Sequence, residues 1–192
     1  LIGKLVDTLD ELGLRDNTTI ILWGDHGFFL GEHGLWCKHS SLYEAIRVPL
    51  IVSSPNMKKN VKTNSMAELV DVYPTLCEIA NIDPPKYIDG VSLVPILKDP
   101  DVKLKNEIYT RYQRHEAIVD ENYSYTEFVN LNPDDKIPDG EPGMADMLFD
   151  MKNDKDQNID ISNRPSSQEL VKKYKEKLAL MRKYVNQKKI DK

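Results

Sequence analysis

The sequence has 192 residues, of which 40% are hydrophobic and 30% are charged, a balance typical of one globular domain or of a domain with a small appended unit. The formal net charge of −5 argues against nucleic acid as a partner, because nucleic-acid-binding proteins present a concentrated basic face. No apolar run is long enough to cross a bilayer, so we expect no membrane partner.

The first predicted elements are a helix and a strand. Apolar residues form one stripe over residues 2–12, and Gly13 is a residue type that commonly ends helices. The β-branched, apolar run 18–23 then predicts a buried strand, and helix–turn–strand order is the second half of an α/β unit. Because the chain begins without Met and inside a helical pattern, we expect it to be a piece of a longer protein.

The rest of the chain divides near residue 105. A second apolar run, 48–52, predicts another buried strand. Beyond residue 105, four short runs rich in Tyr, Ile, Val and Thr predict an antiparallel meander: 107–112, 116–119, 123–129 and 147–151. Residues 166–189 have the spacing of a long amphipathic helix. The sequence thus predicts an α/β part over 1–105 and a small α+β unit over 106–192, with an antiparallel sheet and a long C-terminal helix.

The residues suited to chemistry gather in one glycine-rich loop after the first strand. Asp25 offers a hard oxygen ligand for a divalent cation, and His26 offers an imidazole. They are able to provide two ligands to one ion, or one ligand and one contact to substrate. Lys38 has a compact charge suited to a sulfate or phosphate oxygen or to protonating a leaving oxygen. The combination suits hydrolysis of an anionic ester, while a solvated turn with a surface lysine is the plain alternative.

The other polar residues of this kind are expected to be structural. Glu32 and His33 are expected to hold the loop through backbone hydrogen bonds. His39 and His115 are expected to be structural or solvent-facing, with a contact to substrate as the alternative.

The loop as a whole closely resembles the second signature region of the sulfatases. Residues 24–38 read GDHGFFLGEHGLWCK, similar to the pattern S-D-H-G-x-x-L-G-E-H-G-x-W-x-K of iduronate-2-sulfatase-like members. Five later segments also resemble family segments: 43–44 with 47–52, 71–76, 89–93, 123–127 and 148–150. The resemblance therefore covers nearly the whole chain.

This resemblance implies the C-terminal part of an alkaline-phosphatase-like α/β fold and a sulfuric-ester hydrolase acting on carbohydrate sulfates. It implies one Ca²⁺ ion and a formylglycine nucleophile. By position, Asp25 is a Ca²⁺ ligand, His26 is a metal ligand or a contact to the sulfate and the nucleophile, and Lys38 binds the sulfate and assists the leaving oxygen. Family members are mostly periplasmic, secreted or lysosomal.

The departures from the family pattern concern the other half of the site. The nucleophile motif C/S-x-P-S/A-R and the Asp-Asp pair that completes the Ca²⁺ site are absent, and position 24 is Gly where Ser is usual. We therefore expect the remainder of the catalytic domain to be a partner of this chain, and this chain alone to be inactive and to hold Ca²⁺ poorly. Two alternatives remain open: a phosphodiesterase or phosphomutase-like metalloenzyme of the same superfamily, and a non-catalytic binding module.

Overall fold

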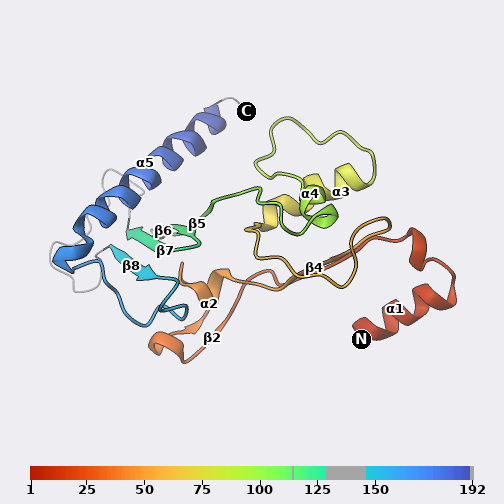
Figure 1. Ribbon diagram of the computed structural model, residues 1–192, viewed down its shortest axis with the longest axis horizontal. Helices are drawn as coiled ribbons and strands as arrows, with labels where there is room; N and C mark the ends of the chain where they lie inside the picture. The colour runs from red at the N-terminus through yellow and green to blue at the C-terminus, as the bar shows by residue number, and fades with distance from the viewer. Residues whose placement is uncertain (114, 129–145, 191–192) are drawn as a thin grey trace.

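The structure is a computed structural model that describes residues 1–113, 115–128 and 146–190 (Figure 1). The α-helices are α1 (Ile2–Glu11), α2 (Tyr43–Ile46), α3 (Val72–Ile79), α4 (Val94–Lys98) and α5 (Gln168–Ile190). The strands are β1 (Ile20–Trp23), β2 (Phe29–Leu30), β3 (Trp36–Cys37), β4 (Leu50–Ser53), β5 (Glu107–Tyr112), β6 (His115–Asp120), β7 (Tyr123–Phe128) and β8 (Met147–Asp150). Within this described part, no helix is both long enough and apolar enough to cross a membrane.

The two strands predicted before residue 105 are present as an antiparallel pair. Ile20 in β1 lies opposite Ser53 in β4, and Trp23 lies opposite Leu50. Their predicted burial is wrong, because Trp23 is 47% exposed and Ile51 is 58% exposed. Composition sets the extended backbone, whereas burial requires another layer over the strand face. Helix α1 does not provide that layer, since none of its residues is buried.

The predicted meander is confirmed as a four-stranded antiparallel sheet in the order β5-β6-β7-β8. Its strands pair with their neighbours in the chain, with Tyr109 opposite Ile118 and Ile118 opposite Tyr125. The bounds predicted for the first strand agree with those of β5. Position 129, the predicted end of the third strand, lies outside the described residues.

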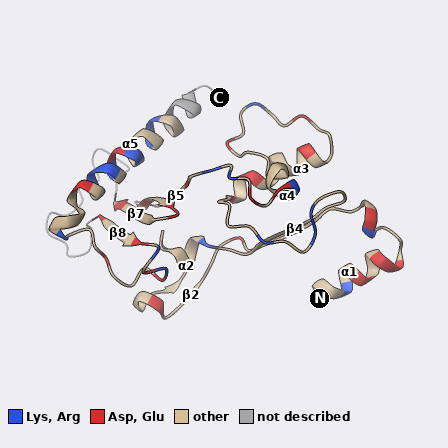
Figure 2. Cartoon of the chain, in the orientation of Figure 1, with Lys and Arg blue, Asp and Glu red and all other residues tan. Residues whose placement is uncertain are grey.

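Helix α5 covers one face of this sheet and confirms the predicted C-terminal helix (Figure 1). Tyr174 and Leu178 of α5 pack on three fully buried residues of the sheet, Ile118, Tyr125 and Leu148. Its basic residues (Figure 2) also reach carboxylates of the sheet, and Arg182 bonds both Glu116 and Glu127. Apolar burial therefore holds the helix, and ion pairs fix its position along the sheet.

A buried ion cluster joins α3 to the segment that enters β5. Asp71, fully buried, accepts hydrogen bonds from the backbone N–H of Glu68 at 2.8 Å and of Val91 at 2.9 Å. The ammonium of Lys105 lies 2.8 Å from both Asp71 oxygens and 2.5 Å from Glu68. Burial alone would lower the pKa of Lys105, but the hydrogen bonds to Asp71 and Glu68 outweigh it and raise this pKa.

A second core cluster contains residues from both sides of position 105. Phe29 of β2, with Leu42 and Ala45 around the start of α2, packs on Phe149 and Met151 at the end of β8. The glycine-rich loop is thus anchored on the four-stranded sheet. The division into 1–105 and 106–192 stays a prediction, and this core shows that the two parts share buried surface.

Candidate active site

The glycine-rich loop is an ordered hairpin that lies between β1 and α2. Phe29 in β2 pairs with Cys37 in β3, and Phe29 is fully buried. The turn between the two strands includes Gly31 at φ +130°, a conformation for which glycine is the default residue. Pairing and burial together hold the loop in one conformation.

Gly27 brings the loop into direct contact with α2. Its N–H donates to the Ala45 carbonyl at 2.8 Å. A Cβ added at Gly27 would lie 1.7 Å from the Glu44 carbonyl oxygen, so only glycine fits at this position. This close approach sets where the preceding residues, Asp25 and His26, leave β1.

Asp25 and His26 form a pair directly after β1. His26 Nδ1 lies 2.8 Å from the Gly27 carbonyl, which only accepts, so Nδ1 carries the proton. Nε2 lies 3.3 Å from Asp25 Oδ2. When the imidazole is neutral, Asp25 Oδ2 and His26 Nε2 are both hydrogen-bond acceptors. A cation bound by both atoms, or a second proton on the ring, satisfies them. The Asp25 side chain is 83% exposed, so its oxygens are accessible.

The pair fits part of a metal site. Two ligands 3.3 Å apart are both able to contact one ion at bond lengths of about 2.0–2.6 Å. Calcium takes about 6–8 oxygen ligands. The described ranges hold no group of three or more His, Cys, Asp or Glu placed to bind a metal. Asp25 and His26 are thus two members of a ligand set that needs further groups.

Lys38 lies at the far end of the same loop and is exposed. Its carbonyl accepts the N–H of Ser40 at 2.9 Å, and within the described part of the chain its ammonium forms no hydrogen bond or ion pair. The structure places Lys38 on the same loop as Asp25 and His26, with no hydrogen bond or ion pair between the lysine and that pair among the described residues. The ammonium is available to an anion.

Glu32 holds the hairpin through a backbone hydrogen bond, as expected, whereas His33 holds it differently. Glu32 accepts the N–H of Leu30 at 2.6 Å, and backbone hydrogen bonds lower its pKa. His33 contacts a side chain rather than the backbone: its Nε2 lies 3.4 Å from Glu44 Oε2 on α2. Its ring also meets Phe29 edge-on, with ring centroids 6.1 Å apart.

The remaining two histidines differ in environment. His115, at the start of β6, packs against Phe128 with ring centroids 4.3 Å apart, and burial lowers its pKa. Its expected structural role is consistent with this packing. His39 is exposed, and its Nδ1 lies 2.5 Å from the hydroxyl of Tyr112 at the end of β5.

Sequence reasoning missed a residue that fixes the start of α2, the helix on which the loop is held. Gln157 is 2% exposed, and its Oε1 accepts the N–H of Tyr43 at 2.6 Å, at the start of α2. Its φ of +53° lies in the left-handed region, which glutamine seldom adopts, so the residue type does not predict this backbone conformation. No local signal would have identified it, because the contact joins positions 114 residues apart.

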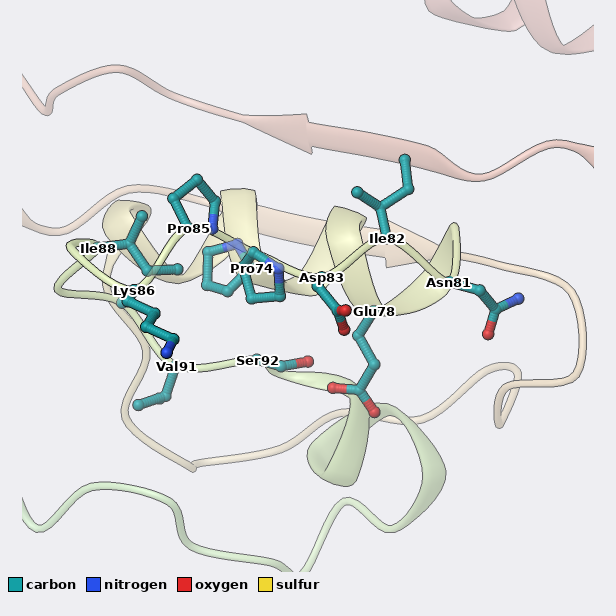
Figure 3. Close-up of a pocket in the computed structure, with 12 residues that line it drawn as sticks. Pro74, Glu78, Asn81, Ile82, Asp83, Pro85, Lys86, Ile88, Val91 and Ser92 are labelled. Carbon is teal, nitrogen blue, oxygen red and sulfur yellow. The ribbon is translucent and has the colours of Figure 1, made fainter.

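A separate pocket of about 710 Å³ lies beside α3 (Figure 3). Its lining includes the apolar residues Pro74 and Ile88, and the carboxylates of Glu78 and Asp83 lie on one side of it, away from Lys86. None of Asp25, His26 and Lys38 lines it. Because two carboxylates repel an anion, this pocket is a poor candidate for the ester site.

The sequence matches the family described as N-sulphoglucosamine sulphohydrolase, C-terminal, over residues 31–184. It is 33% identical over 193 residues to an N-acetylglucosamine-6-O-sulfatase of Bacteroides thetaiotaomicron, covering 94% of this chain and 32% of that protein. It is 31% identical over 128 residues to a sulfatase of Formosa agariphila, covering 66% of this chain and 25% of that protein. The chain thus spans about a third or less of the length of these relatives.

Solved structures confirm the predicted fold class. The structure of BT4656 in complex with its substrate D-glucosamine-2-N,6-O-disulfate matches with a TM-score of 0.83 and 28% identity, over 95% of this chain and 37% of that one. A phosphonate monoester hydrolase from Silicibacter pomeroyi matches with a TM-score of 0.81 and 21% identity, over 95% of this chain and 38% of that one. The second match shows a shared fold only.

Proposed function

The chain belongs to the sulfatase family and has its alkaline-phosphatase-like fold, and from this we propose that the longer protein of which it is a part hydrolyses sulfate esters of carbohydrates. The observation that supports this most directly is the loop, which presents a carboxylate–imidazole pair at one end and an available lysine at the other. Below, that longer protein is called the parent protein.

The proposed metal is one Ca²⁺ ion, held in part by Asp25 and His26. Bound there, the ion would neutralise charge on the sulfate group. The pair supports this role because Asp25 Oδ2 and His26 Nε2 face each other at 3.3 Å. Both atoms are acceptors when the imidazole is neutral. In the alternative role, His26 contacts the sulfate and the nucleophile instead of the metal. The proposed formylglycine nucleophile and the other ligands belong to the part of the parent protein outside these 192 residues.

Lys38 is proposed to bind a sulfate oxygen and to protonate the leaving oxygen of the sugar. Its ammonium, accessible and without a partner among the described residues, suits both tasks. A carbohydrate substrate is supported by two relatives, one named N-acetylglucosamine-6-O-sulfatase and one solved with D-glucosamine-2-N,6-O-disulfate. Neither name supports the iduronate-type preference, which stays a prediction. A periplasmic, secreted or lysosomal location is proposed from the family alone.

The rest of the catalytic domain is the proposed partner of the exposed N-terminal elements. Leu5 on α1 and Leu12, the residue that follows this helix, are 70% and 64% exposed, and Trp23 and Ile51 on the β1–β4 pair are 47% and 58% exposed. Apolar faces of this kind are normally covered in a folded protein. The chain's small share of its relatives' length leaves ample sequence to cover them.

The test compares the parent protein with its Asp25→Ala and Lys38→Ala variants, using a sulfated glucosamine and Ca²⁺. We expect Lys38→Ala to reduce kcat by about 10²–10⁴-fold and Asp25→Ala to weaken Ca²⁺ binding measured by calorimetry. If both variants keep wild-type turnover and Ca²⁺ affinity, the loop is a non-catalytic module. Faster cleavage of a phosphate ester with Zn²⁺ or Mn²⁺ would instead support the phosphodiesterase-like alternative.

A further inference from the structure

The residue after Lys38 is tied to the four-stranded sheet. His39 Nδ1 lies 2.5 Å from the hydroxyl of Tyr112, the last residue of β5, and the two rings lie 5.4 Å apart at 36°. The contact joins positions 73 residues apart. It connects the loop with the proposed chemistry to the tip of the β5–β6 hairpin.

The hairpin holds Tyr112 in place from its own side. Tyr112 pairs with His115 in β6, and the His115 ring is packed on Phe128 of β7. The side-chain amide of Gln113 donates to the Tyr112 hydroxyl at 3.2 Å. A phenol hydroxyl is able to accept this bond and also donate to an imidazole nitrogen, so both contacts are satisfied together.

Lys38 lies between two fixed neighbours. On one side, Cys37 pairs with the buried Phe29 across the β2–β3 hairpin. On the other side, His39 is bound to Tyr112. The lysine side chain has no partner of its own among the described residues, so its position depends on the backbone at these two neighbours.

We propose that Tyr112 is a positioning residue for Lys38, acting through His39. The inference rests on the proposed function and deepens it, because it assigns to the small α+β unit a part in departure of the leaving group. In that step the S–O bond to the sugar breaks, and its electron pair stays on the sugar oxygen. That oxygen takes a proton from the Lys38 ammonium. The sulfuryl group forms its new S–O bond to a hydroxyl of the hydrated formylglycine, which the proposed function places outside this chain, and the proton of that hydroxyl is released to water.

The leaving group gives a readout that separates positioning from mere structural support. A sugar alkoxide is a poor leaving group and needs the proton, whereas a nitrophenolate leaves without one. A displacement of about 1 Å in a catalytic group is able to reduce rates by about 10²-fold. We therefore expect Tyr112→Phe to lower kcat for a 6-O-sulfated glucosamine at least about tenfold and to change kcat for nitrophenyl sulfate less than about twofold.

The experiment measures kcat and KM of the parent protein and five variants on both substrates, Lys38→Ala among them. Tyr112→Phe and His39→Ala are expected to show the same leaving-group pattern, and the double variant is expected to be no worse than either alone, because both remove one interaction. Tyr109→Phe is the matched control, because it also removes a tyrosine hydroxyl from β5. That hydroxyl interacts with the buried Glu116 and not with His39. Tyr109→Phe is expected to leave the ratio of the two kcat values unchanged.

The results separate the possible failures. If Tyr112→Phe behaves as wild type on both substrates while Lys38→Ala loses activity, the positioning role is wrong and the proposed function stands. Equal losses on both substrates would also overturn it, because general loosening of the site has no leaving-group dependence. If the wild-type parent protein hydrolyses neither ester, the proposed function is wrong and this inference falls with it.

Discussion

Replacing Gly27 with alanine tests the contact that fixes the loop on α2. The added Cβ would lie 1.7 Å from the Glu44 carbonyl oxygen, whereas real Cβ contacts are essentially never shorter than 3.0 Å. Loop and helix would therefore have to separate by more than 1 Å, and the 2.8 Å hydrogen bond from Gly27 N–H to Ala45 would be lost. Overpacking typically costs about 1–3 kcal/mol and a lost hydrogen bond about 0.5–1.5 kcal/mol. We expect a destabilisation of about 2–4 kcal/mol.

Gly24→Ala is the matched control in the same loop. Its nearest contact would be the Val48 side chain at 3.3 Å, which a small shift relieves. We expect it to change the free energy of unfolding by less than about 1 kcal/mol. The assay is urea unfolding of the parent protein, followed by tryptophan fluorescence, together with turnover of a sulfated glucosamine. Equal unfolding midpoints for the two variants would refute the close approach of the loop to α2.

Three further predictions concern α5 and its sheet. Leu178→Ala, at a fully buried position, should destabilise the protein by about 2–5 kcal/mol in urea unfolding, while Leu180→Ala, 65% exposed, should stay within about 0.5 kcal/mol. Arg182→Ala removes the hydrogen bonds to Glu116 and Glu127, while Arg111 and Lys175 still lie 3.3 Å from these two carboxylates, so it should cost about 1–3 kcal/mol; a loss under about 0.5 kcal/mol would contradict this pairing. Burial alone would raise the pKa of Asp120, but the Tyr174 hydroxyl, two backbone N–H groups and the nearby Lys177 outweigh it and lower the pKa below 3.8. Because the folded pKa is the lower one, this stabilisation is complete above the unfolded value and is lost as the pH falls through the folded value. The unfolding midpoint of the wild type should therefore fall more steeply than that of Asp120→Asn as the pH falls below about 5.

The elements with a regular pattern were predictable from the sequence. The Tyr-, Ile- and Thr-rich composition of β5 and the apolar spacing of α5 are local properties, and both elements are present. The burial of β1 was not predictable, because it depends on a layer over the strand face and not on the strand's own residues. Composition therefore predicted the type of element correctly and the burial of β1 incorrectly.

The candidate site divides in the same way. Asp25, His26 and Lys38 were selectable as candidates because their residue types and spacing form a motif within one loop. Gln157 and Tyr112 were not assigned to the loop, because each reaches it from a position far away in the chain. Contacts between distant positions arise from tertiary packing, which a local pattern does not contain.

The burial of Phe29 against Phe149 has a consequence for where harmful substitutions lie. A loop whose anchor is part of another element's core opens when that element opens, so its hydrogen-exchange protection should follow that of β8. A substitution that lowers the stability of β8 would then raise the population of molecules with a displaced Lys38, although it touches no ligand. Destabilising substitutions in the last quarter of this sequence would thus reduce turnover by raising the fraction of molecules in which β8 is open. A stabilising ligand or a lower temperature would restore turnover.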